Sequence, residues 1–240
     1  MKILLTALFS TIMISSAFSQ IEKQTAFKFE KQITINLPAN YLLYLPMDYN
    51  ESDKNFPLVL FLHGSGERGD DLEKVKIHGI PKLITQGKDF PFIVVSPQCP
   101  MDIYWNTKIL SALLDEIESK YRVDTNKVYL TGLSMGGHGT WELAIKEPNR
   151  FAAIAPVCGW TDTSKACIIS HIPTWVFHGA KDNVVPVKAA EDMVAALKKC
   201  GSDVMLTIYP EANHNSWTET YNNEELYKWM MDRSLDKNKK

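Results

Sequence analysis

The chain has 240 residues, of which 45% are hydrophobic and 22% charged, and its formal net charge is −2 at pH 7. With 26 Lys and Arg against 28 Asp and Glu, it lacks the basic excess typical of nucleic-acid-binding proteins. We therefore expect no nucleic-acid partner. This length suits one globular domain with a large buried core and leaves little room for a second.

The first residues have the features of a secretory signal peptide. Lys2 precedes an apolar run over residues 3–14, and small residues then lead to Ala17-x-Ser19. The run is too short to span a bilayer comfortably, and its end suits a signal peptidase. We expect cleavage after Ser19, secretion or periplasmic location, and one domain over residues 20–240 without stable membrane insertion. An uncleaved anchor or a first core helix is the alternative.

The four cysteines are Cys99, Cys158, Cys167 and Cys200. Export would permit disulfides, and four cysteines allow three pairings. The shortest loop favours Cys158 with Cys167, and buried free thiols are the alternative because a free cysteine packs like a small apolar residue. The spacing matches no zinc motif, so we expect no metal site.

The hydrophobic pattern predicts strands that alternate with helices. Two alternating segments, 33–37 and 41–45, predict an antiparallel hairpin at the start of the mature chain. Short apolar runs typical of strands buried on both faces follow at residues 58–62, 92–95, 128–130, 151–155, 174–177 and 205–208. Amphipathic stretches predict helices at residues 108–120, 135–146, 188–199 and 224–233. This order is typical of an α/β fold, with a mostly parallel sheet covered by helices on both faces.

One segment has the pattern of a nucleophile elbow. The run at residues 128–130 leads into Gly132-x-Ser134-x-Gly136 and then into the helical stretch at 135–146. A serine on such a sharp strand-to-helix turn is strained, and glycines two positions before and after it avoid backbone clashes. This context indicates the α/β-hydrolase fold with Ser134 as nucleophile. A glycine-rich turn that only packs a helix on the sheet is the alternative.

A serine nucleophile needs a base, and the base needs an orienting acid. In this fold the chain order is serine, acid, histidine. His214 follows the run at residues 205–208, so we select it as general base over a merely solvated loop histidine. For the acid we prefer Asp182, just past the run at 174–177, and Asp162 is the rival.

The oxyanion hole of this fold uses backbone amides. We expect one donor at Met135, the residue after the nucleophile, and the second at Ser65, with Gly64 as the fallback. His63 is expected to orient this loop rather than to catalyse. Glu67 and Arg68 are expected to pair with each other, to brace the loop or to be solvated.

Further residues near the expected site are candidates for a substrate pocket. They are His63, Trp160 and Trp217, although core packing is an equal alternative for the tryptophans. His138 and His178 are expected to be packing groups.

The runs Leu60-Phe-Leu-His-Gly-Ser-Gly-Glu-Arg-Gly, Gly132-Leu-Ser-Met-Gly-Gly, His178-Gly-Ala-Lys-Asp and Asn213-His resemble a known branch of α/β-hydrolases. This branch contains phospholipases/carboxylesterases and polyhydroxybutyrate depolymerases, and secreted feruloyl and acetyl-xylan esterases look similar. The resemblance implies a carboxylic-ester substrate and no cofactor.

The combined expectation is a secreted serine esterase that forms an acyl-enzyme. Its substrates would be short-chain, acetyl or hydroxycinnamoyl esters, either small or linked to a polysaccharide. A similarity to the catalytic domains of prolyl oligopeptidases keeps a peptidase open. A non-catalytic carbohydrate-binding surface protein on the same fold is the third possibility.

Overall fold

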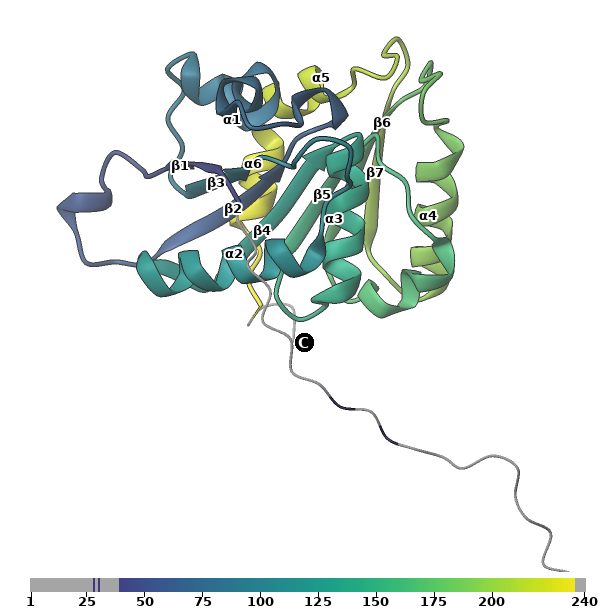
Figure 1. The fold of residues 1–240 in the computed structure, drawn as a ribbon. Helices are drawn as coiled ribbons and strands as arrows, with labels where there is room; N and C mark the ends of the chain where they lie inside the picture. The colour runs from purple at the N-terminus through teal and green to yellow at the C-terminus, as the bar shows by residue number, and fades with distance from the viewer. Residues whose placement is uncertain (1–27, 29, 31–38, 236–240) are drawn as a thin grey trace, which may run out of the picture. The chain divides into compact units, whose positions relative to one another are not determined.

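The computed structural model describes residues 28, 30 and 39–235, and the fold is that of residues 39–235. A seven-stranded sheet has the order β1-β3-β2-β4-β5-β6-β7 (Figure 1). Its strands are β1 (Tyr41–Tyr44), β2 (Phe56–Leu62), β3 (Ile93–Pro97), β4 (Val123–Leu133), β5 (Ala153–Val157), β6 (Thr174–Gly179) and β7 (Val204–Tyr209). The mostly parallel α/β fold expected from the sequence is confirmed.

The antiparallel part of the sheet lies at the β1 edge. β1 pairs antiparallel with β3, in a register that places Tyr41 opposite Pro97, while the other strands pair in parallel. Residues 33–37, the expected first arm of the hairpin, lie outside the described residues, as does the expected signal peptide at residues 1–19.

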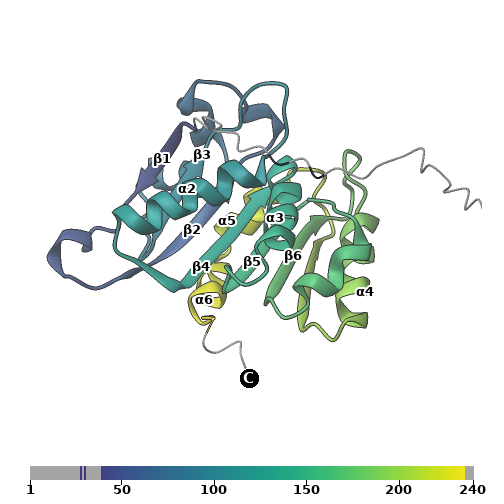
Figure 2. The same cartoon turned by 60° about the horizontal axis from the view of Figure 1, so that its bottom comes forward.

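Helices cover both faces of the sheet (Figures 1 and 2). They are α1 (Gly79–Thr85), α2 (Thr107–Lys120), α3 (Met135–Lys146), α4 (Lys188–Lys199), α5 (Trp217–Asn222) and α6 (Glu224–Met231). Buried residues of α2, α3 and α4 belong to one apolar core, and those of α1, α5 and α6 belong to the other. Within the part of the chain that is described, no helix is long and apolar enough to cross a bilayer.

β2 shows why the strands are apolar throughout. Leu58, Leu60 and Leu62 point into the first core, whereas Val59 and Phe61 point into the second. Successive side chains of a strand face opposite sides, so a strand between two helical layers must be apolar at every position.

The expected pairing of Cys158 with Cys167 is wrong. Cys167 is bonded to Cys200, with a Cα–Cα distance of 5.2 Å, while Cys99 and Cys158 are buried free thiols. Cys167 lies on the 3-10 helix Thr163–Ile169, which packs against α4, and Cys200 directly follows α4 as its C-cap. Cys158 follows β5 in the buried interior, so tertiary packing rather than loop length determines the pairing.

The order of the strands also predicts where a ligand-binding crevice lies, at the carboxyl ends of β2 and β4. After β2 the chain adds β3 on one side of it and then β4 on the other. The loops that leave the carboxyl ends of β2 and β4 therefore diverge, and open α/β sheets hold their ligands at such a point. Ser65 lies in the segment after β2, and Ser134 directly follows β4.

Candidate active site

Ser134 occupies the turn between β4 and α3, with φ 52° and ψ −114°. This positive φ is unfavourable for a residue with a side chain, and such strain is held only where the surrounding structure enforces it. A Cβ on Gly132 would lie 2.5 Å from the carbonyl oxygen of Gly136, and one on Gly136 would collide with the backbone of Leu62. The two glycines therefore permit the turn that presents the serine.

A hydrogen-bonded chain joins Ser134 to His214 and Asp182. The Oγ of Ser134 lies 2.9 Å from Nε2 of His214, and Nδ1 of His214 lies 2.7 Å from Oδ2 of Asp182. Because a carboxylate can only accept, Nδ1–H donates to Asp182, which leaves Nε2 free to accept the serine proton. The geometry thus joins three side chains from loops after β4, β6 and β7, as expected from the sequence.

Asp182 is firmly held. Its Oδ1 accepts hydrogen bonds from the backbone amides of Val184 and Val185, each at 2.9 Å. Its Oδ2 also lies 3.2 Å from Nε2 of the buried His178, which bonds the carbonyl oxygen of Val185 at 2.8 Å. These contacts aim the carboxylate at His214.

Asp162, the rival acid, has a different place. Its carboxylate accepts the amide of Ser164 at 3.0 Å and so caps the 3-10 helix Thr163–Ile169. This bond lowers the pKa of the fully exposed Asp162 carboxyl. Asp162 therefore acts as a cap in this structure.

A cavity of about 410 Å³ opens beside Ser134. Ser65 and Met135, the residues expected to supply the oxyanion amides, line it together with the serine. The other lining residues are Arg68, Tyr104, Trp160, Val184, Val185, Pro186 and Ala189. Nucleophile and both expected donors thus share one enclosure large enough for a small organic molecule.

Aromatic rings form one side of this cavity. The ring of Trp160 stacks on His138 with 4.8 Å between centroids and 8° between planes, and Tyr104 meets the same imidazole edge-on. His138 Nδ1 also bonds the carbonyl oxygen of Trp160 at 2.9 Å. His138 thus packs the aromatic wall, which agrees with its expected role.

Two of the three expected pocket residues lie elsewhere. Trp217 lines a separate cavity beside α1, although its ring meets His214 edge-on at 5.4 Å. His63 is 1% exposed, its Nδ1 lies 2.6 Å from the carbonyl oxygen of Gly64, and its Nε2 accepts the amide of Cys99 at 3.0 Å. Burial lowers the pKa of His63 to about 4, so this neutral side chain braces its loop as expected.

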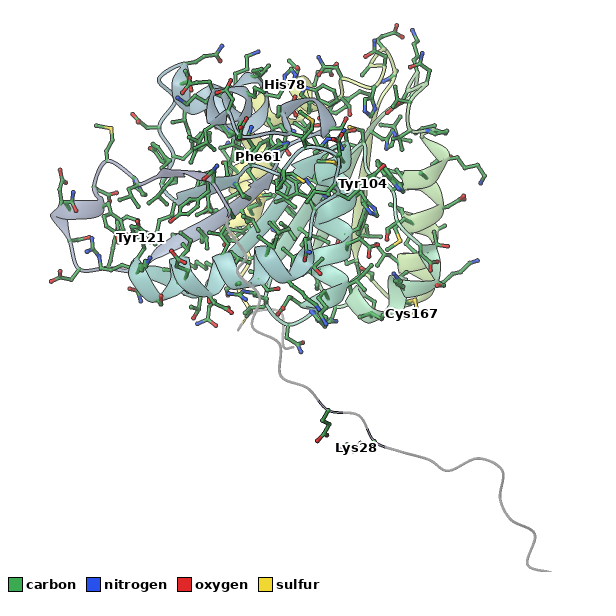
Figure 3. The ribbon with its side chains drawn as sticks, viewed as in Figure 1. Lys28, Phe61, His78, Tyr104, Tyr121 and Cys167 are labelled. Atoms are coloured by element: carbon green, nitrogen blue, oxygen red, sulfur yellow. A yellow bond between two sulfur atoms is a disulfide. The ribbon has the colours of Figure 1, made fainter. Side chains whose placement is uncertain are left out.

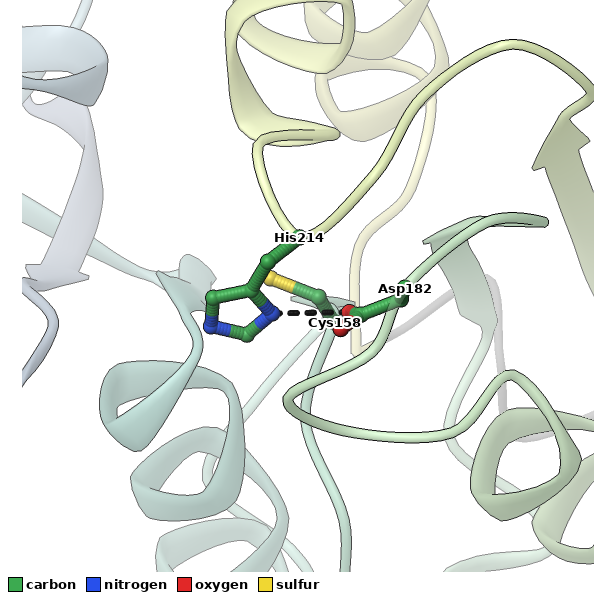
Figure 4. A group of neighbouring side chains, drawn as sticks. All are labelled: Cys158, Asp182 and His214. Atoms are coloured by element: carbon green, nitrogen blue, oxygen red, sulfur yellow. Dashed lines mark hydrogen bonds and ion pairs between the residues drawn. The ribbon is translucent and has the colours of Figure 1, made fainter.

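Cys158 lies beside His214 and Asp182 (Figure 4). Its Sγ, a carboxylate oxygen of Asp182 and a ring nitrogen of His214 lie within 4.8 Å of one another, so by residue type the group could hold a metal ion. Burial raises the pKa of the Cys158 thiol to about 12, and His214 Nδ1 is already bonded to Asp182. A metal there would have to displace both protons, so a hydrogen-bonded chain fits these donors better.

The sequence reasoning missed several cavity residues. From the sequence, Arg68 is expected only to pair or to brace its loop, and no pattern links Tyr104 or the segment Val184–Pro186 to a pocket. A signal was present, because each follows a parallel strand and the carboxyl ends of parallel strands meet at one edge. Figure 3 shows Tyr104 at this edge of the sheet, with Cys167 at the far end of α4.

The model of the dienelactone hydrolase family matches residues 102–232, which include Ser134, Asp182 and His214. The chain belongs to this family. The match covers more than half of the chain and contains the whole hydrogen-bonded group.

Individual relatives point to ester chemistry. A bifunctional acetylxylan esterase/xylanase of Neocallimastix patriciarum is 29% identical over 57% of this chain and 21% of its own length. A poly(3-hydroxyoctanoate) depolymerase of Pseudomonas fluorescens is 29% identical over 44% of this chain and 47% of its own length. A thermostable esterase of known crystal structure is 36% identical to this chain in sequence and has a TM-score of 0.70 against it. The match covers 81% of this chain and 59% of the esterase chain. The chain thus spans about a fifth of the length of the acetylxylan esterase/xylanase and about half of the length of the depolymerase.

Proposed function

We propose that the protein is a carboxylic-ester hydrolase that works through a serine acyl-enzyme. One observation carries the proposal: Ser134 Oγ lies 2.9 Å from His214 Nε2, whose other nitrogen lies 2.7 Å from Asp182, at the wall of a cavity. A serine hydroxyl becomes a useful nucleophile when an oriented base can remove its proton. Membership of the dienelactone hydrolase family and the esterases among its relatives support this activity.

The reaction divides into two half-reactions. His214 Nε2 takes the proton of Ser134 as Oγ attacks the ester carbonyl carbon, and the same nitrogen then protonates the departing alcohol. Water enters, gives a proton to His214 and attacks the acyl-serine, which releases the acid and restores the hydroxyl. Asp182 holds the imidazole in its Nδ1–H tautomer and stabilises the imidazolium that forms in each half.

The oxyanion that forms in each half needs fixed donors. The amide of Met135 opens helix α3, so its N–H and the helix dipole point toward developing negative charge. The amide of Ser65 is the second donor, on the loop that His63 braces from within. Two neutral amides stabilise an oxyanion without first having to reorganise around it.

The substrates are short-chain, acetyl or hydroxycinnamoyl esters, either small or attached to a polysaccharide. Trp160 and Tyr104 offer aromatic surface for a planar acyl group, and Tyr104 and Val184 are 59% and 64% exposed at the rim. An exposed rim suits an ester that projects from a larger molecule. The acetylxylan esterase and the depolymerase among the relatives support a polymer-linked ester.

Export of the protein is part of the proposal. The leader pattern at residues 1–19 supports it, and so does the disulfide between Cys167 and Cys200, since disulfides persist in oxidising compartments. N-terminal sequencing of the protein recovered outside the cytoplasm tests this, and we expect the first residue to be Gln20.

The test of the activity compares the mature protein with Ser134→Ala. We expect wild type to be labelled by a fluorophosphonate and to hydrolyse 4-nitrophenyl acetate and methyl ferulate. In the variant, labelling disappears and kcat/KM falls by roughly 10⁴- to 10⁶-fold. A folded wild type that turns over no ester refutes the proposal, and cleavage of short peptides without any esterase activity indicates a peptidase.

A further inference from the structure

A second cavity, of about 180 Å³, is lined by residues of α1 and α5, two helices that pack against each other (Figure 1). It shares no lining residue with the cavity beside Ser134. Trp217 is one of its lining residues, and the same ring meets that of His214 edge-on, with 5.4 Å between centroids. A single aromatic side chain thus connects this cavity to the general base.

The chemistry of ester cleavage determines which part of the substrate lies near His214. Nε2 of His214 protonates the departing alcohol, so the alcohol oxygen must come within hydrogen-bond reach of this nitrogen. The acyl group extends from the other side of the carbonyl carbon, and the cavity of about 410 Å³, which Ser134 lines and His214 does not, can receive it. The rest of the alcohol therefore lies over His214 and toward Trp217.

The cavity between α1 and α5 offers hydrogen-bonding groups that the fold does not use. The ammonium of Lys82 and the side-chain amide of Gln86 make no hydrogen bond or ion pair with the described residues. Asn222 donates through Nδ2 to the carbonyl oxygen of Thr218 at 2.9 Å, which leaves its Oδ1 able to accept. Nε1 of Trp217 is buried and has no acceptor in the described part of the chain. Unused donors and acceptors around one aromatic ring suit a ligand rich in hydroxyl groups.

His78 anchors the wall of this cavity to the loop after β2. Its ring lies against Trp217 with 5.3 Å between centroids, and its Nε2 lies 3.8 Å from Oε1 of Glu67. Glu67 is 6% exposed, and its other oxygen lies 3.8 Å from Nδ1 of His63. The pairing of Glu67 with Arg68, one of the possibilities open from the sequence, does not occur in the structure. Through His78, the Trp217 ring is thus fixed relative to this loop.

We propose that the cavity between α1 and α5 binds the alcohol part of the substrate, and that this part is a sugar residue. An aromatic ring packs against the apolar face of a sugar, while amide and ammonium groups form hydrogen bonds with its hydroxyls. The inference rests on the proposed esterase function and assigns a binding site to the polysaccharide side of the ester. Trp217, Gln86 and Lys82 bind substrate and take no part in proton transfer.

The test compares esters that share an acyl group and differ in the alcohol. One pair is an acetylated methyl xyloside against methyl acetate, and the other is a feruloylated methyl arabinoside against methyl ferulate. For each pair the ratio of kcat/KM, sugar ester over methyl ester, is measured by titration of the released acid in wild type, Trp217→Leu and Lys82→Met. The ratio cancels any general effect of a substitution on Ser134 and His214.

We expect the ratio of at least one pair to fall roughly tenfold in Trp217→Leu, mainly through a higher KM for the sugar ester. Lys82→Met should lower the same ratio roughly fivefold, because it removes a charged donor to a sugar hydroxyl. Lys82→Met leaves the contact between Trp217 and His214 intact, so it tests the cavity even if Trp217→Leu loses all activity.

The control variant is Lys108→Met. It removes the same group from an exposed position on α2, whose buried residues belong to the core on the other face of the sheet from α1. We expect its ratios to equal those of wild type. An equal shift in Lys82→Met and Lys108→Met would mean that overall charge determines the preference, which overturns the assignment to this cavity.

The remaining outcomes separate this inference from the proposed function. If Trp217→Leu and Lys82→Met slow sugar and methyl esters equally, or leave both unchanged, the cavity binds no part of the alcohol and the inference is refuted, while Ser134-dependent turnover of the methyl esters keeps the esterase function. If folded wild type hydrolyses 4-nitrophenyl acetate but neither sugar ester, the inference fails alone. Without turnover of any ester, both proposals fail.

Discussion

Two histidines at the same edge of the sheet have opposite environments. His63 follows β2, is 1% exposed, and has both ring nitrogens bonded to backbone groups of Gly64 and Cys99. His214 follows β7, and its ring lies between a hydroxyl and a carboxylate, with 18% of the side chain exposed. A histidine that is saturated by fixed backbone partners can only brace, whereas one between Ser134 and Asp182 can gain and lose a proton. The partners, rather than the residue type, distinguish the two regions.

The largest effect should come from removing the imidazole of His214. We expect His214→Ala to lower kcat/KM by roughly 10⁴- to 10⁶-fold, because Ser134 then lacks its base, with the melting temperature within a few degrees of wild type. Ester hydrolysis and calorimetry measure the two quantities. Retention of more than a tenth of the activity would contradict the role of His214.

The acid can be tested by a matched pair of substitutions. Asp182→Asn should lower kcat by roughly 10⁴-fold, since an amide in place of the carboxylate permits the wrong tautomer of His214. Asp162→Asn should change kcat by less than about twofold, because asparagine also caps a helix. A larger loss in Asp162→Asn would reverse the assignment of the acid.

His63 should instead affect stability. We expect His63→Ala to lower the free energy of unfolding by about 2–4 kcal/mol, since it leaves a buried cavity and unpaired backbone groups at Gly64 and Cys99. Urea denaturation at pH 7.5 provides the measurement. An unchanged midpoint would show that the ring does not brace this loop.

The buried ring should also make stability depend on pH. The unfolded His63 takes up a proton near pH 6.5, whereas in the folded protein burial lowers its pKa to about 4. Between these values the unfolded state binds more protons, so the free energy of unfolding should decrease by on the order of 2–3 kcal/mol as the pH falls from 6.5 to 4. Urea titrations of wild type and His63→Gln over this range test the origin of the slope, which should flatten in the variant.

Each histidine has a buried cysteine beside it, and neither thiol should react in the folded protein. Burial raises the pKa of Cys99 to about 11 and that of Cys158 to about 12, so both stay protonated at neutral pH. Iodoacetamide should label no thiol of the native protein, two after unfolding, and four after unfolding with reduction. Native labelling at Cys158 would show that the space beside His214 opens to solvent.

The hydrophobic periodicity predicted many of the helices and strands, because the formation of these elements depends on local sequence. The stretches 135–146 and 188–199 are helices α3 and α4 with the expected bounds. Each apolar run overlaps a strand, although the runs at 92–95 and 151–155 begin one and two residues before β3 and β5. The prediction missed the short helix α5, since six residues give too little periodic signal. Strand ends also extended past the apolar runs, as in β4, where polar residues 124–127 continue the strand.

The sequence alone was enough to select Ser134, Asp182 and His214. The sharp turn identifies the serine, and its acid and base must then follow it in the chain and lie at the same edge of the sheet. Whether Cys167 pairs with Cys158 or Cys200, and whether Arg68 faces Glu67 or the cavity, depended on which segments pack together. Tertiary structure decided these points, since contacts between residues far apart in the chain leave no periodic trace in the sequence. Tertiary structure also determined the different roles of His63 and His214, because only the folded chain brings each ring to its bonding partners.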